Sequence, residues 1–156
     1  MSRTVGDRGK DSEKTLIETL EKLNAKHMAF AYERLPDARS AGGRMKACIC
    51  DFLVWWRPAF PFPNQPERIS VQLEVKETQH NFRITRDKIR QLPRMRRVQN
   101  AGGFGLILIH HSTLDQWRVL PVNHFYGEGV TSWDLSDVPL FDTAGEALAS
   151  TDLFPT

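Results

Sequence analysis

The sequence predicts an α/β fold in which α-helices flank a mixed central β-sheet. A helical pattern near the N-terminus precedes three strand-like segments, and a second helical stretch follows them. An apolar run that begins at Phe104 comes directly after this stretch, which is typical of a right-handed crossover onto the existing sheet. The chain of 156 residues suits one domain with a hydrophobic core and is too short for two.

The first expected element is an N-terminal helix. Residues 1–11 are polar and expected to be mobile, and Asp11 or Ser12 can cap a helix that runs to about Lys26. Leucines recur at helical spacing on one face of this segment: Leu16, Leu20 and Leu23.

Three expected strands follow, with two loops between them. Residues 27–33 alternate large apolar with small or polar side chains, and residues 47–56 are apolar except for one acid, as in a buried strand. Residues 68–77 alternate strictly between apolar and polar side chains. The loops are a basic, glycine-containing segment (35–46) and a segment with four prolines (57–67) that we expect to be rigid.

The second half of the chain is expected to add one helical stretch and two strands. Residues 85–100 have a helical pattern, and Pro93 should kink this helix or start a second one. The glycine-rich residues 101–103 should end the helix. Residues 104–110 are typical of a fully buried strand, and residues 116–120 of another strand after a turn.

The charge is divided unevenly along the chain. All 21 lysine and arginine residues lie in residues 1–126, which also hold 13 acids and so carry a net charge of +8. Residues 127–156 carry −6, from Glu128, Asp134, Asp137, Asp142, Glu146 and Asp152. We expect a basic body (1–126) that binds a polyanion, and an acidic C-terminal extension (127–156) that packs on this body or trails from it.

Composition excludes several classes of protein. No run approaches the ~20 apolar residues of a membrane helix, and the polar N-terminus lacks the core of a signal peptide. Cys48 and Cys50 lie two residues apart on one expected strand, and two thiols are too few for a zinc site of four. We therefore expect a protein of a reducing, cytoplasmic compartment.

The most informative pattern is an acid inside an apolar strand, followed by Glu-x-Lys on the next strand. A carboxylate at Asp51 needs compensation there, for which a metal cation is one candidate. Glu74 and Lys76 share one face of their strand. Carboxylates from adjacent strands, with the Val75 carbonyl as a further ligand, suit Mg²⁺ or Mn²⁺. A lysine beside them can act on a water or a phosphate, so these groups suffice for phosphodiester hydrolysis.

Other interpretations of the notable side chains stay open. Glu-x-Lys also occurs by chance as a solvated pair, although the acid in the preceding strand favours catalysis. We expect Trp55 and Trp56 to lie in the core or an interface rather than to stack on DNA bases. Phe60 and Phe62 are either wedges against unstacked bases or packing residues, and we favour packing.

The site residues resemble the Asp…Glu-x-Lys core of the restriction-endonuclease-like nuclease superfamily. The wider sequence, over about residues 7–126, is similar to RecU-type Holliday-junction resolvases. The similar segments are residues 73–78 (LEVKET), 102–109 (GGFGLILI) and 119–121 (VLP), together with the opening Arg8-Gly9, Glu13 and Leu16.

The resemblance implies a restriction-endonuclease-like core and a role for each matching residue. Asp51 and Glu74 would be metal ligands and Lys76 the catalytic lysine. Glu13 on the first helix would close the acidic site, and Gln91 would position water or phosphate. For Gln91, an ordinary exposed helix residue is an equally good interpretation.

Three features leave the resemblance incomplete. Glu18 and Glu21 compete with Glu13 as the helix acid, although the Arg-Gly match favours Glu13. The proline-rich segment 57–67 is an insertion between the two strand acids, and residues 35–46 are shorter than the family's projecting stalk. The acidic extension has no counterpart that we recognise.

Basic residues outside the acidic site are the candidates for DNA binding. The expected helix carries many more basic than acidic residues, so its positive charge needs an external anion. Its basic side chains would mostly contact phosphates of the DNA. The candidates are Arg39, Arg44 and Lys46 in the first loop, and Arg83, Arg86, Lys88, Arg90, Arg94, Arg96 and Arg97 in the expected helix.

Together these observations indicate an endonuclease, dependent on Mg²⁺ or Mn²⁺, that resolves four-way (Holliday) junctions by paired cleavage. The near two-fold symmetry of a junction calls for a homodimer. The expected location is the cytoplasm of a bacterial cell, or of the host if the protein is phage-encoded. The alternatives are a restriction or repair nuclease acting on duplex DNA and a non-catalytic DNA-binding protein of the same fold.

Overall fold

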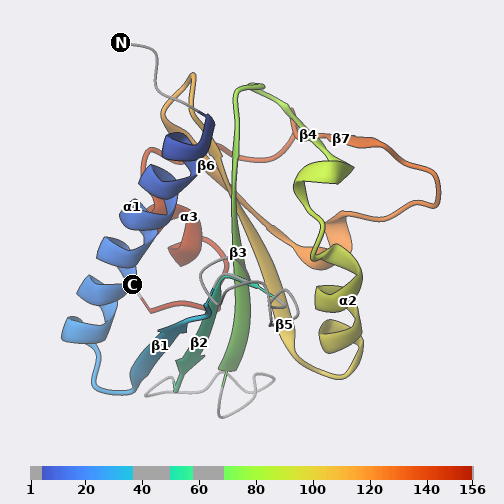
Figure 1. The fold of residues 1–156 in the computed structure, drawn as a ribbon. Helices are drawn as coiled ribbons and strands as arrows, with labels where there is room; N and C mark the ends of the chain where they lie inside the picture. The colour runs from blue at the N-terminus through green and yellow to red at the C-terminus, as the bar shows by residue number, and fades with distance from the viewer. Residues whose placement is uncertain (1–4, 37–49, 58–68, 156) are drawn as a thin grey trace.

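A five-stranded mixed β-sheet lies at the centre of the molecule (Figure 1). The computed structural model describes residues 5–36, 50–57 and 69–155, with side chains from Asp11 onward. Its elements in chain order are α1 (Val5–Lys26), β1 (Phe30–Arg34), β2 (Phe52–Trp56), β3 (Ile69–Thr78), β4 (Arg83–Thr85), η1 (Arg86–Lys88), α2 (Leu92–Asn100), β5 (Phe104–His111), β6 (Gln116–Pro121), η2 (Val122–His124), β7 (Ser132–Asp134) and α3 (Ala144–Ala149).

The strand order in the large sheet is β1-β2-β3-β5-β6. β3 and β5 run parallel, and the other neighbouring strands run antiparallel. The segment between the parallel strands contains α2, as expected for a crossover connection. The predicted α/β class with a mixed sheet and flanking helices is therefore confirmed.

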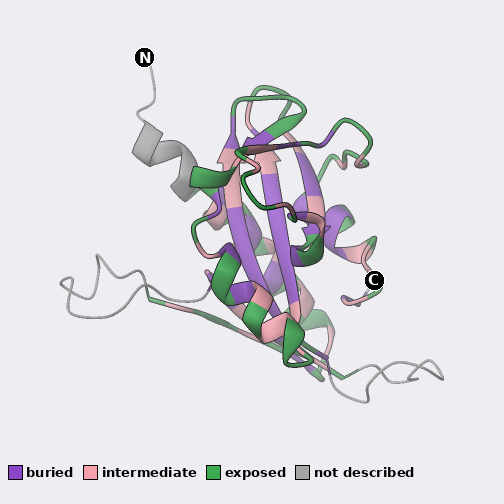
Figure 2. Cartoon of the chain, turned by 90° about the vertical axis from the view of Figure 1, so that its right-hand side faces the viewer, coloured by how far each residue is buried: buried purple, intermediate pink, exposed green. Residues whose placement is uncertain are grey.

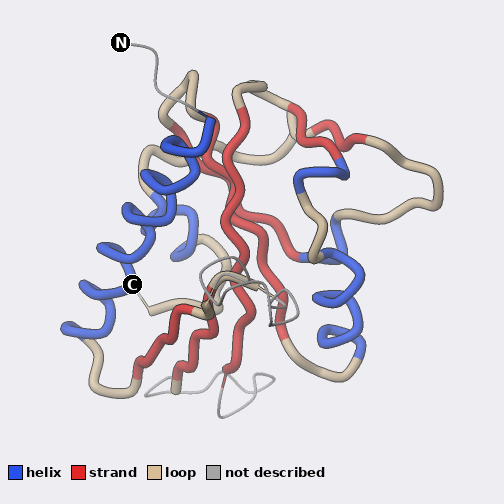
Figure 3. Tube along the Cα trace, viewed as in Figure 1, coloured by secondary structure: helices blue, strands red, loops and turns tan. Residues whose placement is uncertain are grey.

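Helices cover both faces of this sheet (Figure 3). One core cluster joins α1 and α3 to the sheet through Leu16, Leu20, Leu73 and Leu148, among others. A second cluster joins α2 to the opposite face and includes Met95. Because both faces are covered, the central strands are buried along most of their length (Figure 2).

The predicted alternation of β3 is confirmed, but its polar face is not solvated. The apolar residues Ile69, Val71, Leu73 and Val75 lie in the core cluster beneath α1. On the other face Gln72 is 8% exposed and Glu74 is fully buried. The central position of β3 removes from water a face that would be wet on an edge strand.

The structure corrects the predicted start of the first helix. α1 begins at Val5, so the polar segment before Asp11 is largely helical. Ser12 does not cap the helix, because it lies inside α1 with 1% exposure and donates a hydrogen bond to Glu77. A polar segment can still form a helix. The spacing of the leucines predicted only the part of α1 that packs on the core.

The predicted helix over residues 85–100 is also corrected. Only α2 is an α-helix here, and Pro93 lies in its first turn, so the proline starts the helix. The preceding residues form β4 and η1, and β4 pairs with β7 from the acidic segment. The glycine stop is confirmed, since Gly102 has φ +93° and Gly103 donates its N–H to the carbonyl of Val98.

The acidic C-terminal segment packs on the same core clusters as the rest of the chain. Trp133 and Leu135 lie in the cluster beneath α2. Leu148 and Phe154 lie in the cluster beneath α1. The division at residue 126 stays a prediction. None of the helices in the described residues has the length and hydrophobicity to span a membrane.

Candidate active site

Asp51 and Glu74 meet where the pairing of β2 with β3 ends. Phe52 is the register partner of Leu73, so the next pair along the two strands would be Asp51 and Glu74. Asp51 lies directly before β2 rather than inside the predicted strand, which is a correction. Its carboxylate accepts the Val75 N–H at 2.8 Å, in place of a ladder hydrogen bond.

Glu74 is a carboxylate removed from water. The residue is fully buried, and within the described residues neither carboxylate oxygen accepts a hydrogen bond of good geometry. Burial, followed by the charge of Asp51, raises the pKa of Glu74 to about 7, although Lys76 acts in the opposite direction. An anion in this environment is unfavourable unless a cation lies close to it.

Lys76 supplies one such cation. Its ammonium group forms an ion pair with Oε1 of Glu74, and its side chain is 19% exposed. The two residues are on the same face of β3, as the sequence predicted. Lys76 therefore links the buried carboxylate to the solvent-facing side of the site.

The helix acid Glu13 lies close enough to interact with Asp51. Burial is the main cause of a raised pKa at Asp51, and the charge of Glu13 raises it further. Arg34, at the end of β1, forms an ion pair with Glu13 and lowers the pKa of Asp51. Of the competing acids, Glu21 interacts electrostatically with Tyr32. Sequence reasoning missed Arg34, whose only signal was its place at the end of a strand.

The site offers oxygen atoms suited to a divalent cation. Besides the two carboxylates, the Val75 carbonyl points to the same side as the Val75 N–H that Asp51 accepts, as in any extended strand. Among the described residues, no group of three or more histidine, cysteine, aspartate and glutamate side chains is arranged to hold a metal ion. Two carboxylates and a carbonyl nevertheless match the hard oxygen ligands of Mg²⁺ and Mn²⁺.

Gln91 is not joined to this acidic group by any hydrogen bond within the described residues. It caps the N-terminus of α2, where its main-chain carbonyl accepts N–H groups from the first turn. Its amide oxygen is buried and lacks a partner there, so Gln91 is not the exposed residue of the alternative interpretation.

The candidate DNA-binding residues divide into three groups. Arg39, Arg44 and Lys46 lie outside the described residues. The other candidates spread over β4, η1 and α2 instead of one helix, and all are exposed except the half-buried Arg96. Within this group, the acidic segment contacts Arg86, which lies 5.7 Å from the Trp133 ring centroid and 3.4 Å from the carbonyl oxygen of Gly127.

A second polar cluster was not predicted, and it connects α1 to the ends of the central strands. Ser12 Oγ donates to Glu77 at 2.8 Å and lies 2.9 Å from Nδ1 of His110. The other ring nitrogen of His110 lies 3.0 Å from Asp115. Because Ser12 precedes Glu13, this cluster fixes the turn of α1 that carries the helix acid. The neighbouring His111 takes no part in this cluster, and its Nδ1 lies 2.6 Å from the carbonyl oxygen of His80.

The chain has a fold that is similar to the restriction-endonuclease-like fold. No family model matches the chain, and no curated protein matches it. Among solved structures the chain is similar to Hjc of Archaeoglobus fulgidus, a Holliday junction resolvase from an archaeal hyperthermophile, with a TM-score of 0.52. The sequence identity is 19%, and the match covers 88% of this chain and 98% of Hjc. This likeness confirms the predicted restriction-endonuclease-like fold.

Proposed function

We propose that the chain is a metal-dependent endonuclease of the RecU type that resolves four-way DNA junctions by paired cleavage. The observation that carries this proposal is the buried Glu74 carboxylate, which lies beside Asp51 and forms an ion pair with Lys76. The likeness in fold to a Holliday junction resolvase supports it.

Asp51, Glu74 and the Val75 carbonyl are the groups that would hold Mg²⁺ or Mn²⁺. When bound, such a cation lowers the pKa of a water and neutralises charge on a phosphate. Glu13 adds a further acid beside Asp51, and Arg34 holds Glu13 in place.

Lys76 is the residue that acts on the reacting groups. Its ammonium group lies against Glu74 and is partly exposed, so it can reach a phosphate that enters from solvent. There it stabilises negative charge that develops on the phosphate, or orients the attacking water. Gln91 has a buried, unpartnered amide oxygen, and we propose that it orients water or phosphate once DNA is bound.

The substrate is branched DNA and the active form is a homodimer. Two sites related by a two-fold axis match the near two-fold symmetry of a junction. The exposed basic side chains of β4, η1 and α2 bind phosphates and give affinity that falls as salt rises. We place the protein in the cytoplasm of a bacterial cell, or of the host if it is phage-encoded.

The test compares cleavage of a synthetic four-way junction with cleavage of linear duplexes of the same sequence, with and without Mg²⁺ or Mn²⁺. We expect metal-dependent, symmetric cuts in the junction alone. Asp51→Asn should abolish cleavage, whereas the exposed control Asp137→Asn should leave it unchanged.

Three outcomes would contradict the proposal. Equal rates on junction and duplex would indicate a restriction or repair nuclease. Cleavage that survives Asp51→Asn would show that the site is wrong. Junction binding without cleavage in either metal would indicate a non-catalytic DNA-binding protein.

A further inference from the structure

Trp55 is an exposed aromatic side chain on the sheet, so of the two expected positions, the core and an interface, it does not occupy the core. The structure describes all four tryptophans of the chain. Trp117 and Trp133 are 3% and 7% exposed, and Trp56 is partly buried against the core and against the ring of His27. Trp55 is 41% exposed. Trp55 therefore leaves more of its indole in water than the other three tryptophans do.

Trp55 points to the same face of the sheet as the candidate active site. Side chains alternate along a strand, so Trp55 shares the face of Leu53 and not the face of Trp56. Its register partner on β3 is Ser70, which shares a face with Glu74. The exposed indole and the Glu74 carboxylate therefore lie on the same face of the sheet, with the nearly buried Gln72 between Ser70 and Glu74.

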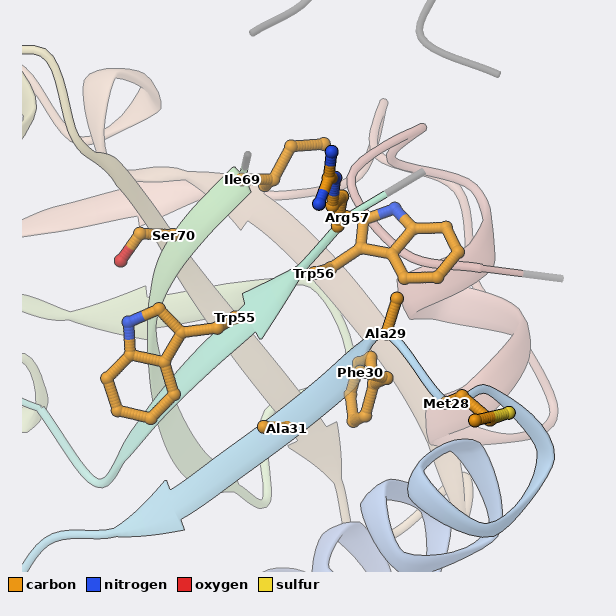
Figure 4. A pocket seen from close by; sticks show the side chains of 9 residues that line it. All are labelled: Met28, Ala29, Phe30, Ala31, Trp55, Trp56, Arg57, Ile69 and Ser70. Carbon is orange, nitrogen blue, oxygen red and sulfur yellow. The ribbon is translucent and has the colours of Figure 1, made fainter. Parts of the chain in front are cut away.

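The neighbours of Trp55 leave its ring open to a flat ligand. Its register partners are Ala31 on β1 and Ser70 on β3, and both have small side chains. Figure 4 shows the indole projecting past these two residues and away from Trp56. A planar group can therefore lie against the ring without displacing a side chain of the flanking strands.

A cavity beside this indole adds a positive charge. The cavity has a volume of about 420 Å³ and lies at the ends of β1, β2 and β3 that are far from Glu74. Among the described residues that line it, Arg57 carries the charge. The Arg57 N–H donates to the carbonyl of Ala29 at 3.1 Å, which fixes the position of this residue beside β1. An indole and a guanidinium that line one cavity match a nucleotide, in which a planar base adjoins an anionic phosphate.

The distance to the active site is compatible with one bound strand. Ser70 and Glu74 are four residues apart on β3, which corresponds to about 13 Å. A strand whose phosphate lies at Glu74 can thus reach Trp55 along the sheet.

We propose that Trp55 is a stacking platform for an unpaired base of the DNA strand, with Arg57 binding an adjacent phosphate. The choice of DNA rests on the proposed function. A branched substrate exposes unpaired or easily unstacked bases near its centre, whereas a perfect duplex does not, so Trp55 contributes to the preference for branched DNA.

The test measures binding of a single-stranded oligonucleotide, a four-way junction and a perfect duplex in EDTA, so that no strand is cut. Trp55→Ala should weaken binding of the single strand and the junction by about 5- to 150-fold. Trp55→Phe should retain most of the affinity, and duplex binding should change by less than about twofold. Phe82→Ala is the matched control, since Phe82 is also exposed, at 54%, and lies outside this face.

Tryptophan fluorescence supplies a second measurement. Acrylamide should quench the emission of Trp55 in the free protein, because the other three indoles are more buried. Bound single strand should protect this emission, and Trp55→Phe should remove the quenchable part.

Two results would overturn the inference. One is equal binding of the single strand by Trp55→Ala and by the wild type. The other is a change of Trp55→Ala from dimer to monomer in sedimentation, which would make this face a contact between subunits. If the wild type cleaves junctions and Trp55→Ala binds DNA as well as the wild type does, only this inference is refuted. Stacking on Trp55 without any cleavage would instead refute the proposed nuclease.

Discussion

Glu74 should make the metal-free protein less stable as the pH rises. Its pKa is raised from 4.5 to about 7 in the fold, so the folded state holds a proton that the unfolded state releases first. Stability from this group is complete below pH 4.5 and is lost as the pH rises through 7. At about 1.4 kcal/mol per pKa unit, the loss is about 3 kcal/mol.

Glu74→Gln removes this dependence while preserving the shape of the side chain. We expect the variant to gain about 3 kcal/mol over the wild type between pH 4.5 and pH 8. For a chain of this length, that corresponds to a difference of roughly 6–12 °C in Tm. Asp51, whose pKa is also raised by burial, is present in both proteins and contributes to the same trend in each.

The measurement is urea unfolding in EDTA at half-unit pH intervals from 4.5 to 8. Glu18→Gln, in an exposed glutamate of α1, is the control and should follow the wild type. Added Mg²⁺ should restore stability to the wild type at pH 8 and not to Glu74→Gln, because only the wild type offers both carboxylates. Parallel pH profiles for the wild type and Glu74→Gln would refute the assignment of Glu74 as a buried carboxylate with a raised pKa.

Three further predictions concern close packing and buried hydrogen bonds. Gly105→Ala should cost about 1–3 kcal/mol in urea unfolding, because the added Cβ would lie 2.6 Å from a methyl carbon of Val122; an unchanged midpoint would contradict this close approach. Arg118→Met should cost about 1–3 kcal/mol, because the buried guanidinium donates to main-chain carbonyls of two loops; a variant as stable as the wild type would show that these bonds are dispensable. Ser12→Ala should cost about 1 kcal/mol and lower the hydrogen-exchange protection of α1 relative to α2, because it removes the bond to Glu77.

Local pattern was sufficient where an element is defined by its own residues. The alternation of β3 predicted which side chains face the core, because strand geometry repeats every two residues. The apolar run of β5 and the glycine stop before it were predicted for the same reason. Glu74 and Lys76 were placed on one face without any knowledge of the fold.

Local pattern failed where distant segments decide the structure. β4 exists because it pairs with β7, and Arg83 is opposite Asp134 in that ladder. A helical pattern in residues 85–100 could not indicate this partner. Trp55 was expected in the core or an interface, and it lies outside the core, because its register partners, Ala31 and Ser70, have side chains too small to cover it.

The sequence by itself determined the residue types of the candidate site and the face that each strand residue occupies, because backbone geometry repeats locally. Only the tertiary structure decided the burial of Glu74, the approach of Glu13 and Arg34 to Asp51, and the exposure of Trp55. These properties depend on which segments exclude water from a side chain. A carboxylate with an ordinary pKa in the unfolded chain thus titrates at about 7 in the fold.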